Sequence, residues 1–113
     1  MAVVKSIGFR RGDVVLVGLD PTKGKEIQKT RPCVVVSPDE LNDHLQTVIV
    51  APMTTGEHAY PFRIGCRFQG KTGYVVGDQI RTIDRGRVVR TLGRLSSQTL
   101  ASVLGVLQEM FAI

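Results

Sequence analysis

Three short aliphatic runs constrain the fold of this chain more than any other feature. They are Val-Val-Leu-Val at 14–17, Cys-Val-Val-Val at 33–36 and Val-Ile-Val-Ala at 48–51. All three are rich in β-branched residues and are bounded by turn residues, a pattern typical of strands. Each run is continuous rather than alternating, which indicates strands that are buried on both faces.

Similar runs alternate with turn residues along most of the chain and predict six strands, at 13–19, 31–37, 47–53, 61–68, 74–83 and 87–92. Between the second and third strands, Ser37, Pro38 and Glu40 predict the start of a short helix. Ser37 is the expected N-cap, Pro38 takes the first helical position, and Glu40 closes a capping box.

The C-terminal segment differs from the rest, because its apolar residues recur every three or four positions from Ser96 onward. This spacing predicts an amphipathic helix with Ser96 or Ser97 as its N-cap. Gly105 within the helix is expected to mark a close packing contact. One long helix after many strands predicts a mainly β fold, in which the helix lies against a small barrel-like sheet. A length of 113 residues fits a single domain over 1–113.

The charge balance favours a polyanionic partner or an acidic protein. Lysine and arginine outnumber aspartate and glutamate by 15 to 10, which gives a formal net charge of +5. Five arginines lie within 81–94. An ordinary charged face explains them equally well, because strand alternation sends neighbouring side chains to opposite sides.

Cys33 and Cys66 lie in predicted strands, without Cys-x-x-Cys spacing or nearby histidines. We expect them to be buried free thiols in a reducing cytosol rather than zinc ligands. The N-terminus lacks the apolar region of a signal peptide, and no apolar run is long enough to span a bilayer. The sequence therefore predicts a cytoplasmic protein that does not associate with membranes.

The candidate site lies where a polar loop meets the second predicted strand, at Arg31 and Pro32. A guanidinium at the first residue of a strand offers five donors in a planar fork, which suits a phosphate group. Thr54 and Thr55 end the third strand, where hydroxyls and backbone amides can donate to phosphate oxygens. A solvated strand-end arginine and a threonine pair that caps its own turn are the structural alternatives.

The usual catalytic motifs are absent from the chain. It has no G-x-S-x-G, no H-E-x-x-H and no Walker loop. The best candidate metal ligands, Asp78 and Asp84, are isolated, so we expect no metal site and no cofactor. His44 and His58 lie in predicted loops and are interpreted as surface histidines.

Three ordered segments resemble the MazF/PemK (also Kid) family of toxin endoribonucleases. They are RRGDVVLVGLDPTKGKEIQKTRPCVVVS at 10–37, TVIVAPMTT at 47–55 and GDQIRTID at 77–84. The resemblance implies an SH3-like (CcdB/MazF-like) β-barrel with a C-terminal helix, a homodimer, and sequence-specific, metal-independent cleavage of single-stranded RNA. It also implies a type II toxin–antitoxin pair, in which a flexible acidic tail of the antitoxin lies across the RNA groove.

By position, the family's catalytic arginine falls on Arg31, its strand-end threonine on Thr54, and its acidic loop residue on Glu26, the candidate general base. The candidate RNA contacts are Lys25, Lys29, Thr55, Asp78, Gln79 and Arg81. Some members carry histidine just before the loop glutamate and arginine two residues before the Asp-Gln pair. This chain has Lys25 and Val76 there, so the base preference and the proton donor stay open.

The chemistry that the resemblance implies is attack by a ribose 2′-hydroxyl on its own phosphorus. The products are a 2′,3′-cyclic phosphate and a free 5′-hydroxyl. The enzyme has to remove one proton, donate another, and stabilise charge on the phosphoryl oxygens. Arg31 suits the third task, but a guanidinium is a poor base.

Two other functions are compatible with such a fold. A gyrase poison of the CcdB type depends on a C-terminal tryptophan, and this chain contains no tryptophan. A non-catalytic nucleic-acid-binding barrel would be expected to carry stacking aromatics on its sheet, and the aromatic content here is only 5%. Both observations favour the ribonuclease.

Overall fold

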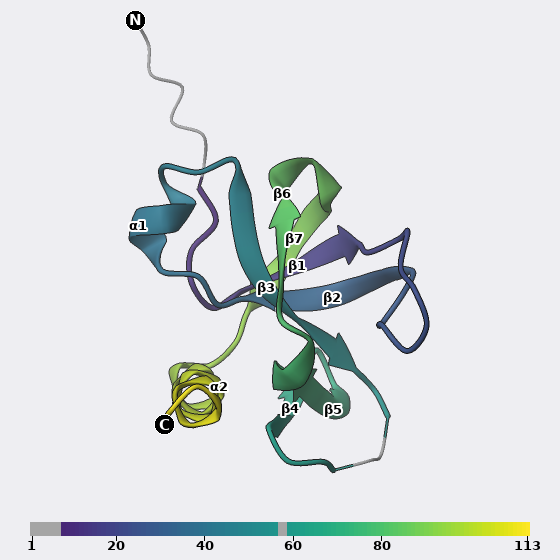
Figure 1. Cartoon of the computed structure of the whole chain (residues 1–113), viewed down its shortest axis with the longest axis vertical. Coiled ribbons are helices and arrows are strands. Elements are labelled where there is room, and N and C mark those ends of the chain that lie inside the picture. Colours follow the sequence, from purple (N-terminus) through teal and green to yellow (C-terminus); the bar gives the residue numbers. More distant parts are fainter. Residues whose placement is uncertain (1–7, 57–58) are drawn as a thin grey trace, which may run out of the picture.

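A computed structural model of the chain describes residues 8–56 and 59–113 (Figure 1). The strands are β1 (Asp13–Gly18), β2 (Thr30–Val35), β3 (Thr47–Thr54), β4 (Arg63–Phe68), β5 (Lys71–Val76), β6 (Arg81–Asp84) and β7 (Val88–Arg94). The helices are α1 (Asp39–Asn42) and α2 (Ser97–Met110), with 3₁₀ turns η1 (Gly77–Gln79) and η2 (Arg85–Arg87).

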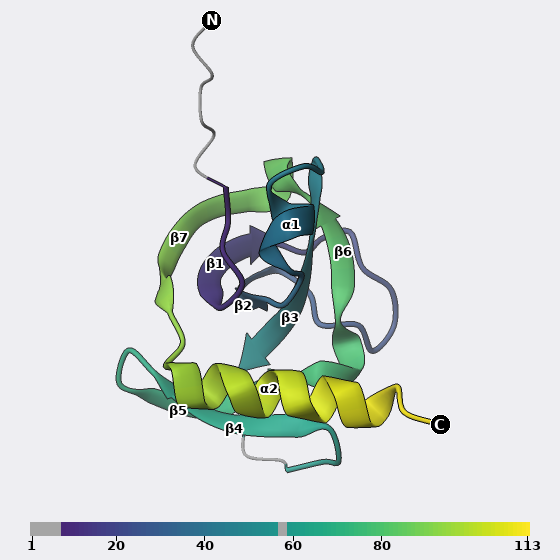
Figure 2. The ribbon, with the colours of Figure 1, turned by 90° about the vertical axis from the view of Figure 1, so that its left-hand side faces the viewer.

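All strand pairings are antiparallel, in the order β4-β5-β3-β2-β1-β7, and β6 also pairs with β3. The long strand β3 joins the two parts of the sheet. Its beginning pairs with β6, and its last residues, Met53 and Thr54, pair with β5. The sheet curves strongly, and α2 runs alongside β4 and β5 (Figure 2). The predicted barrel-like fold with a C-terminal helix is confirmed, although β4 and β7 do not pair within the described residues.

The prediction that the central strands are buried on both faces is also confirmed. Successive residues of β1, Val14 and Val15, are fully buried in two different hydrophobic clusters. Val34 and Val35 divide between the same two clusters on β2. The first cluster lies under α2 and the β4–β5 hairpin, and the second includes β6. A continuous apolar run is therefore favoured, because both faces of these strands contribute side chains to a hydrophobic cluster.

Helix α2 begins as predicted, because Ser96 Oγ accepts the Thr99 N–H at 3.1 Å. Its buried face includes Val103 and Leu107. The expectation for Gly105 is wrong. Gly105 is exposed, and a Cβ atom built there would meet nothing within 4 Å. Within the described residues, no helix has the length and hydrophobicity to cross a membrane.

The predicted capping box at 37–40 is wrong as well. Helix α1 starts at Asp39 with Pro38 as its N-cap and without a side-chain cap. Ser37 is buried instead, where its hydroxyl donates to Asn42 Oδ1 at 2.5 Å and accepts the Ile49 N–H at 3.0 Å. Burial favours this arrangement, because unpaired polar groups in the core are costly and the buried Asn42 needs a partner.

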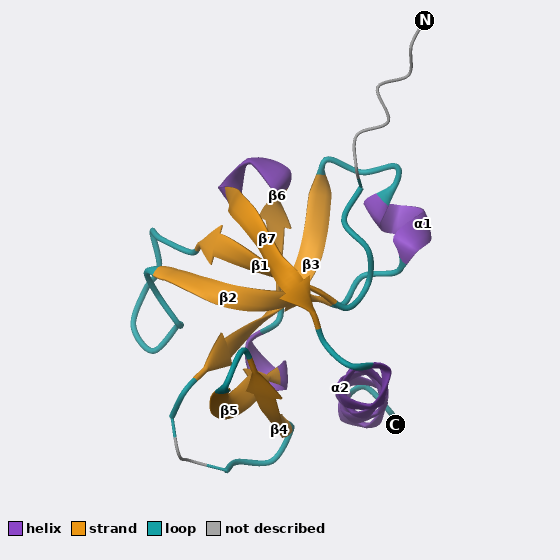
Figure 3. Cartoon of the chain, turned by 180° about the vertical axis from the view of Figure 1, so that it is seen from behind, coloured by secondary structure: helices purple, strands orange, loops and turns teal. Residues whose placement is uncertain are grey.

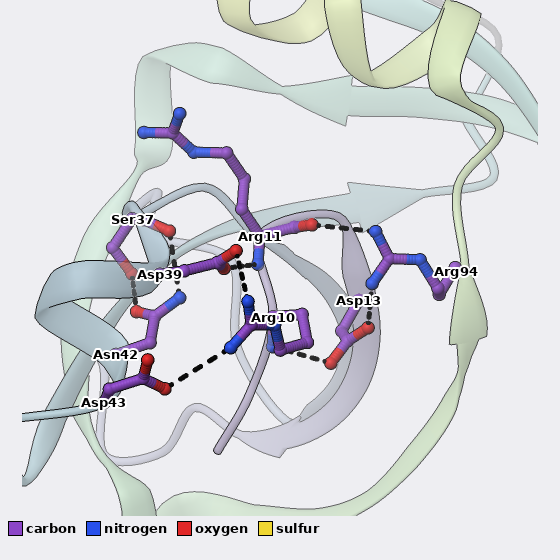
Figure 4. A network of polar contacts seen from close by, with 8 residues as sticks. All are labelled: Arg10, Arg11, Asp13, Ser37, Asp39, Asn42, Asp43 and Arg94. Atoms are coloured by element: carbon purple, nitrogen blue, oxygen red, sulfur yellow. Dashed lines mark hydrogen bonds and ion pairs between the residues drawn. The ribbon is translucent and has the colours of Figure 1, made fainter.

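Charged residues attach the segment before β1 to its surroundings (Figure 4). Arg10 forms an ion pair with Asp39 at 2.8 Å, and the Arg11 N–H donates to the same carboxylate at 2.7 Å. Arg94 pairs with Asp13 at 2.7 Å and so joins β7 to β1. The arginine side chains are about half exposed, so each pair contributes at most about 1 kcal/mol to stability.

The single strand predicted at 74–83 is divided into β5 and β6 by the turn η1. The Gly77 N–H donates to the Phe62 carbonyl at 3.1 Å. A Cβ atom at Gly77 would lie 2.5 Å from that carbonyl oxygen, so only glycine fits this close approach. After the turn, β6 pairs antiparallel with β3. Seen from behind, the turn lies beside the β4–β5 hairpin (Figure 3).

Candidate functional site

A cavity of about 310 Å³ lies where the ends of β2 and β3 meet the β4–β5 hairpin. Arg31 and Thr54 both line it. The β2–β3 ladder ends at the pair of Cys33 and Pro52, and Arg31 and Thr54 each lie two residues beyond this pair on their own strands. The structure thus places the two principal candidate residues on neighbouring strands at one cavity, as predicted.

One edge of the Arg31 guanidinium is bonded to the protein. Its Nε–H donates to the Gln28 carbonyl at 3.1 Å. Within residues 8–56 and 59–113, neither Nη atom of Arg31 makes a hydrogen bond. The residue is half-buried at the cavity. A guanidinium held in this way keeps its two-nitrogen edge available for bidentate recognition of an oxyanion.

The position of Thr54 depends on the close approach of β5 to β3, which the sequence analysis did not predict. The register pairs Thr54 with Tyr74, and the residue before Tyr74 is Gly73. A Cβ atom on Gly73 would lie 1.8 Å from the Thr54 carbonyl oxygen, so no side chain can be accommodated without moving the strand. Gly73 is therefore needed to form this wall of the cavity.

The cavity is cationic. Among the described residues that line it, Arg31 and Lys71 are charged and none is a carboxylate. Thr55, another predicted contact, has an exposed side chain at the same cavity. Lys71 was missed by sequence reasoning, and its only signal was its place beside the turn glycine Gly70. Its position on β5 adds a second positive charge from the hairpin side.

A second cavity, of about 560 Å³, contains most of the other predicted residues. Its lining includes Lys25, Glu26, Asp78, Gln79 and Arg81. Glu26 does not line the cavity that contains Arg31. Its carboxylate is exposed and accepts the Lys23 N–H at 2.6 Å. The structure therefore divides most of the predicted site residues between two cavities.

Asp78 is held by Arg63, a residue that no sequence pattern indicated. The Arg63 Nε and Nη2 atoms donate to the two carboxylate oxygens at 3.1 and 3.3 Å. The guanidinium also lies over the Tyr60 ring, 4.8 Å from its centroid. The hydrogen bond from Arg63 lowers the pKa of Asp78, against a smaller opposing effect of burial.

Gln79 and Arg81 bind the β1–β2 loop, residues 19–29. Gln79 Oε1 accepts the Ile27 N–H at 2.8 Å, and Arg81 Nη1 donates to the Leu19 carbonyl at 3.2 Å. Lys29 lines neither cavity. It adopts a positive φ of 71°, and its side chain is exposed. These side chains were predicted as RNA contacts, but two of the three already have protein partners.

The two thiols differ. Cys33 is completely buried, and burial raises the pKa of its thiol to about 12 despite the opposing charge of Arg81. Cys66 is only half-buried, lines the first cavity, and also has a pKa raised by burial. Both are free, as predicted, but only Cys33 is fully part of the core.

The histidines provide no site that the structure describes. The Nδ1 atom of His44 lies 2.7 Å from the Glu40 carbonyl oxygen, and His58 lies outside the described residues. In the described part of the chain, no three histidine, cysteine, aspartate or glutamate side chains are grouped so that they could hold a metal ion.

Comparison with known proteins identifies the family. The family model described as "PemK-like, MazF-like toxin of type II toxin-antitoxin system" matches residues 10–111. The endoribonuclease toxin MazF of Escherichia coli K12 is 38% identical over 72 residues, which cover 64% of this chain and 65% of that protein, just under two thirds of its length. The endoribonuclease PemK of Escherichia coli is 38% identical over 108 residues, which cover 90% of this chain and 81% of PemK.

Comparison of the fold with solved structures supports the same family. The crystal structure of MazF from Deinococcus radiodurans superposes with a TM-score of 0.83 at 28% identity, covering 94% of this chain and 98% of that one. The family match spans the segments that form both cavities, from β1 to α2. The chain belongs to the PemK-like, MazF-like family of toxins of type II toxin–antitoxin systems.

Proposed function

We propose that this chain is the toxin of a type II toxin–antitoxin pair and that it cleaves single-stranded RNA at specific sequences without a metal ion. The placement of Arg31 and Thr54 at one cationic cavity is the observation that carries this proposal. The relatives MazF and PemK of Escherichia coli are endoribonucleases, which supports it. The formal charge of +5 suits a polyanionic substrate.

The reaction is an attack by the ribose 2′-hydroxyl on the adjacent phosphorus, with departure of the 5′-oxygen of the next nucleotide. A 2′,3′-cyclic phosphate and a 5′-hydroxyl result, and the 2′-hydroxyl proton goes to a base while the leaving oxygen gains a proton. The free edge of Arg31 stabilises the charge that develops on the phosphoryl oxygens, and Thr54 helps to hold the phosphate. Lys71 adds positive charge from the hairpin.

Glu26 is proposed as the base that removes the 2′-hydroxyl proton. It belongs to the same loop as Gln28, which holds Arg31, but it lines the neighbouring cavity. RNA that occupies both cavities brings the two residues to one phosphodiester. Lys25, Lys29 and Thr55 have exposed side chains and are proposed to contact the RNA, whereas Asp78, Gln79 and Arg81 contribute to the wall of the second cavity.

The proposed partners follow from the family and from the charge of the site. A second copy of the chain completes the RNA groove as a homodimer. The antitoxin presents a disordered acidic segment to the cationic groove and orders upon binding. RNA and antitoxin therefore compete for one surface. The toxin acts in the cytoplasm, where its RNA substrate is located.

The test is incubation of the purified protein with a long RNA in EDTA, followed by mapping of the cut ends. We expect cuts at a short recurring motif, with 2′,3′-cyclic phosphate and 5′-hydroxyl ends. An Arg31→Ala protein prepared in parallel controls for contaminating nucleases. Loss of cutting in EDTA with recovery in magnesium would overturn the metal-independent mechanism. Cleaved DNA complexes with purified gyrase and intact RNA would indicate the CcdB-type function instead.

A further inference from the structure

The β1–β2 loop, residues 19–29, is anchored from outside by three side chains of the segment 77–87. At the base of the loop, Arg81 Nη1 donates to the Leu19 carbonyl at 3.2 Å. Arg87 Nη1 donates to the Asp20 carbonyl at 2.7 Å and to the Gly18 carbonyl at 3.2 Å. The third anchor, Gln79, acts nearer the tip. The loop projects beyond the ends of β1 and β2 (Figure 1).

The amide of Gln79 contacts the backbone on both sides of Glu26. Its Oε1 atom accepts the Ile27 N–H at 2.8 Å, and its Nε2 atom donates to the Lys25 carbonyl at 3.5 Å. These two backbone groups flank Glu26 in sequence. An amide is suited to this task because it offers a donor and an acceptor on one planar group. The shorter bond to Ile27 contributes most of the restraint.

The same anchor extends to Arg31. The residue after Ile27 is Gln28, whose carbonyl accepts the Arg31 Nε–H at 3.1 Å. Gln79 thus holds the backbone N–H of Ile27, the residue between Glu26 and Gln28. Since both polar atoms of its amide are used in this way, few donors remain for an RNA base. Gln79 is half-buried and sits on η1, a turn that is itself held at Gly77.

We propose that Gln79 is a positioning residue, which fixes the loop so that Glu26 and Arg31 face one phosphodiester, and that it does not read the RNA sequence. This inference rests on the proposed ribonuclease function. It predicts that loss of the Gln79 amide slows cleavage far more than it weakens RNA binding, because misplacement of catalytic groups by about 1 Å costs roughly a hundredfold in rate.

The experiment compares Gln79→Ala, Gln79→Glu and the control Gln108→Ala, which removes an exposed glutamine from α2. Amide hydrogen exchange of Ile27 is measured by NMR in the free proteins. Loss of one hydrogen bond should speed this exchange roughly fivefold or more in Gln79→Ala. Gln79→Glu keeps an acceptor for the Ile27 N–H, so its exchange should stay near that of the wild type. The control should match the wild type.

Single-turnover cleavage and RNA affinity form the second readout. In Gln79→Ala the rate should fall tenfold or more, while the dissociation constant for RNA changes less than about threefold, because other basic residues hold the backbone. Gln79→Glu should recover part of the rate. If Ile27 exchange is unchanged and RNA affinity falls instead, Gln79 contacts RNA and the inference is wrong.

Two further outcomes separate this inference from others. If every amide of Gln79→Ala exchanges faster by a similar factor, Gln79 supports the whole fold and the positioning role is rejected. If the wild-type protein does not cleave RNA, the proposed function fails. The Ile27 exchange then still decides whether Gln79 anchors the loop.

Discussion

The Nε–H of Arg31 donates to the carbonyl oxygen of Gln28 at 3.1 Å, across the junction between the β1–β2 loop and β2. This bond attaches the principal candidate catalytic side chain to a loop rather than to the sheet on which it is rooted. A movement of the loop therefore also moves the guanidinium. It also keeps a two-nitrogen edge free of partners among the described residues, in a cavity with no described carboxylate.

Replacement of Arg31 tests the charge-stabilising role. Arg31→Ala should lower the single-turnover rate roughly a hundredfold or more, while RNA affinity falls much less. Arg31→Lys should not restore the rate, because an ammonium group cannot reproduce the bidentate fork. Thr54→Val should give a smaller loss of the same kind. A parallel loss of affinity and rate, or a changed circular dichroism spectrum, would assign Arg31 to binding or to structure.

Glu26→Gln tests the proposed base. A base must be deprotonated to accept the 2′-hydroxyl proton, so the wild-type rate should fall at acidic pH. The amide cannot take part in this titration, so the variant should be slower and its pH profile should lack the acid limb. The measurement is the single-turnover rate between pH 4 and 9. An unchanged acid limb in Glu26→Gln would assign that limb to another group.

Gly73→Ala tests whether the close approach of β5 to β3 forms the site. The added methyl group would lie 1.8 Å from the Thr54 carbonyl oxygen. The strands must separate, at an expected cost of about 1–3 kcal/mol in the free energy of unfolding. The cleavage rate should also fall, because the separation of the strands moves Thr54.

Gly105→Ala is the matched control for that experiment. Its methyl group meets open space in α2, so the variant should be more stable than the wild type by about 0.5–1 kcal/mol. Urea denaturation gives both values. Equal stability of Gly73→Ala and the wild type would contradict the role assigned to Gly73.

Stability should depend on acidic pH through the Arg63–Asp78 pair. Because Arg63 lowers the pKa of Asp78 in the folded protein, the pair stabilises the fold above the unfolded-state pKa of about 3.9, and this contribution is lost as the pH falls through the lower folded-state value. Asp78→Asn should be less stable than the wild type at neutral pH by at most about 1 kcal/mol, because the carboxylate is partly exposed.

The measurement is the melting temperature of both proteins between pH 2 and 7. The difference between wild type and Asp78→Asn should shrink toward zero at the acidic end. Glu109→Gln, which removes an exposed carboxylate from the last turn of α2, should not be less stable than the wild type at neutral pH, because a negative charge is not favoured at the C-terminal end of a helix. A gap between wild type and Asp78→Asn that is constant with pH would contradict the ion-pair explanation.

The two thiols should react differently with N-ethylmaleimide. Cys33 is fully buried with a pKa near 12, so it should react only after denaturation. Cys66 should react slowly in the native protein, and its adduct should block cleavage by filling the first cavity. Mass spectrometry locates the label, and Cys66→Ser should be insensitive to the reagent. If protein labelled at Cys66 cleaved RNA at the full rate, the first cavity would not be part of the active site.

Local sequence determined most of the fold. β-Branched runs predict the strands, and their unbroken hydrophobicity predicts burial on both faces, because both properties depend on a residue and its near neighbours. The same holds for α2, whose N-cap and apolar spacing lie within one segment. Arg31 could be selected for a similar reason, because its place at the mouth of a strand is a local feature.

Tertiary structure decided which residues meet. Gln79 contacts Ile27, which lies 52 positions away in sequence, and Gly73 matters only because β5 pairs closely with β3 at Thr54. Local sequence favours a capping box at Ser37, but Ser37 instead forms a hydrogen bond with Asn42, because buried polar side chains need hydrogen-bond partners. Such pairings depend on how strands distant in sequence are brought together. For that reason the loop anchors, the role of Gly73 and the division of the site into two cavities came only from the folded chain.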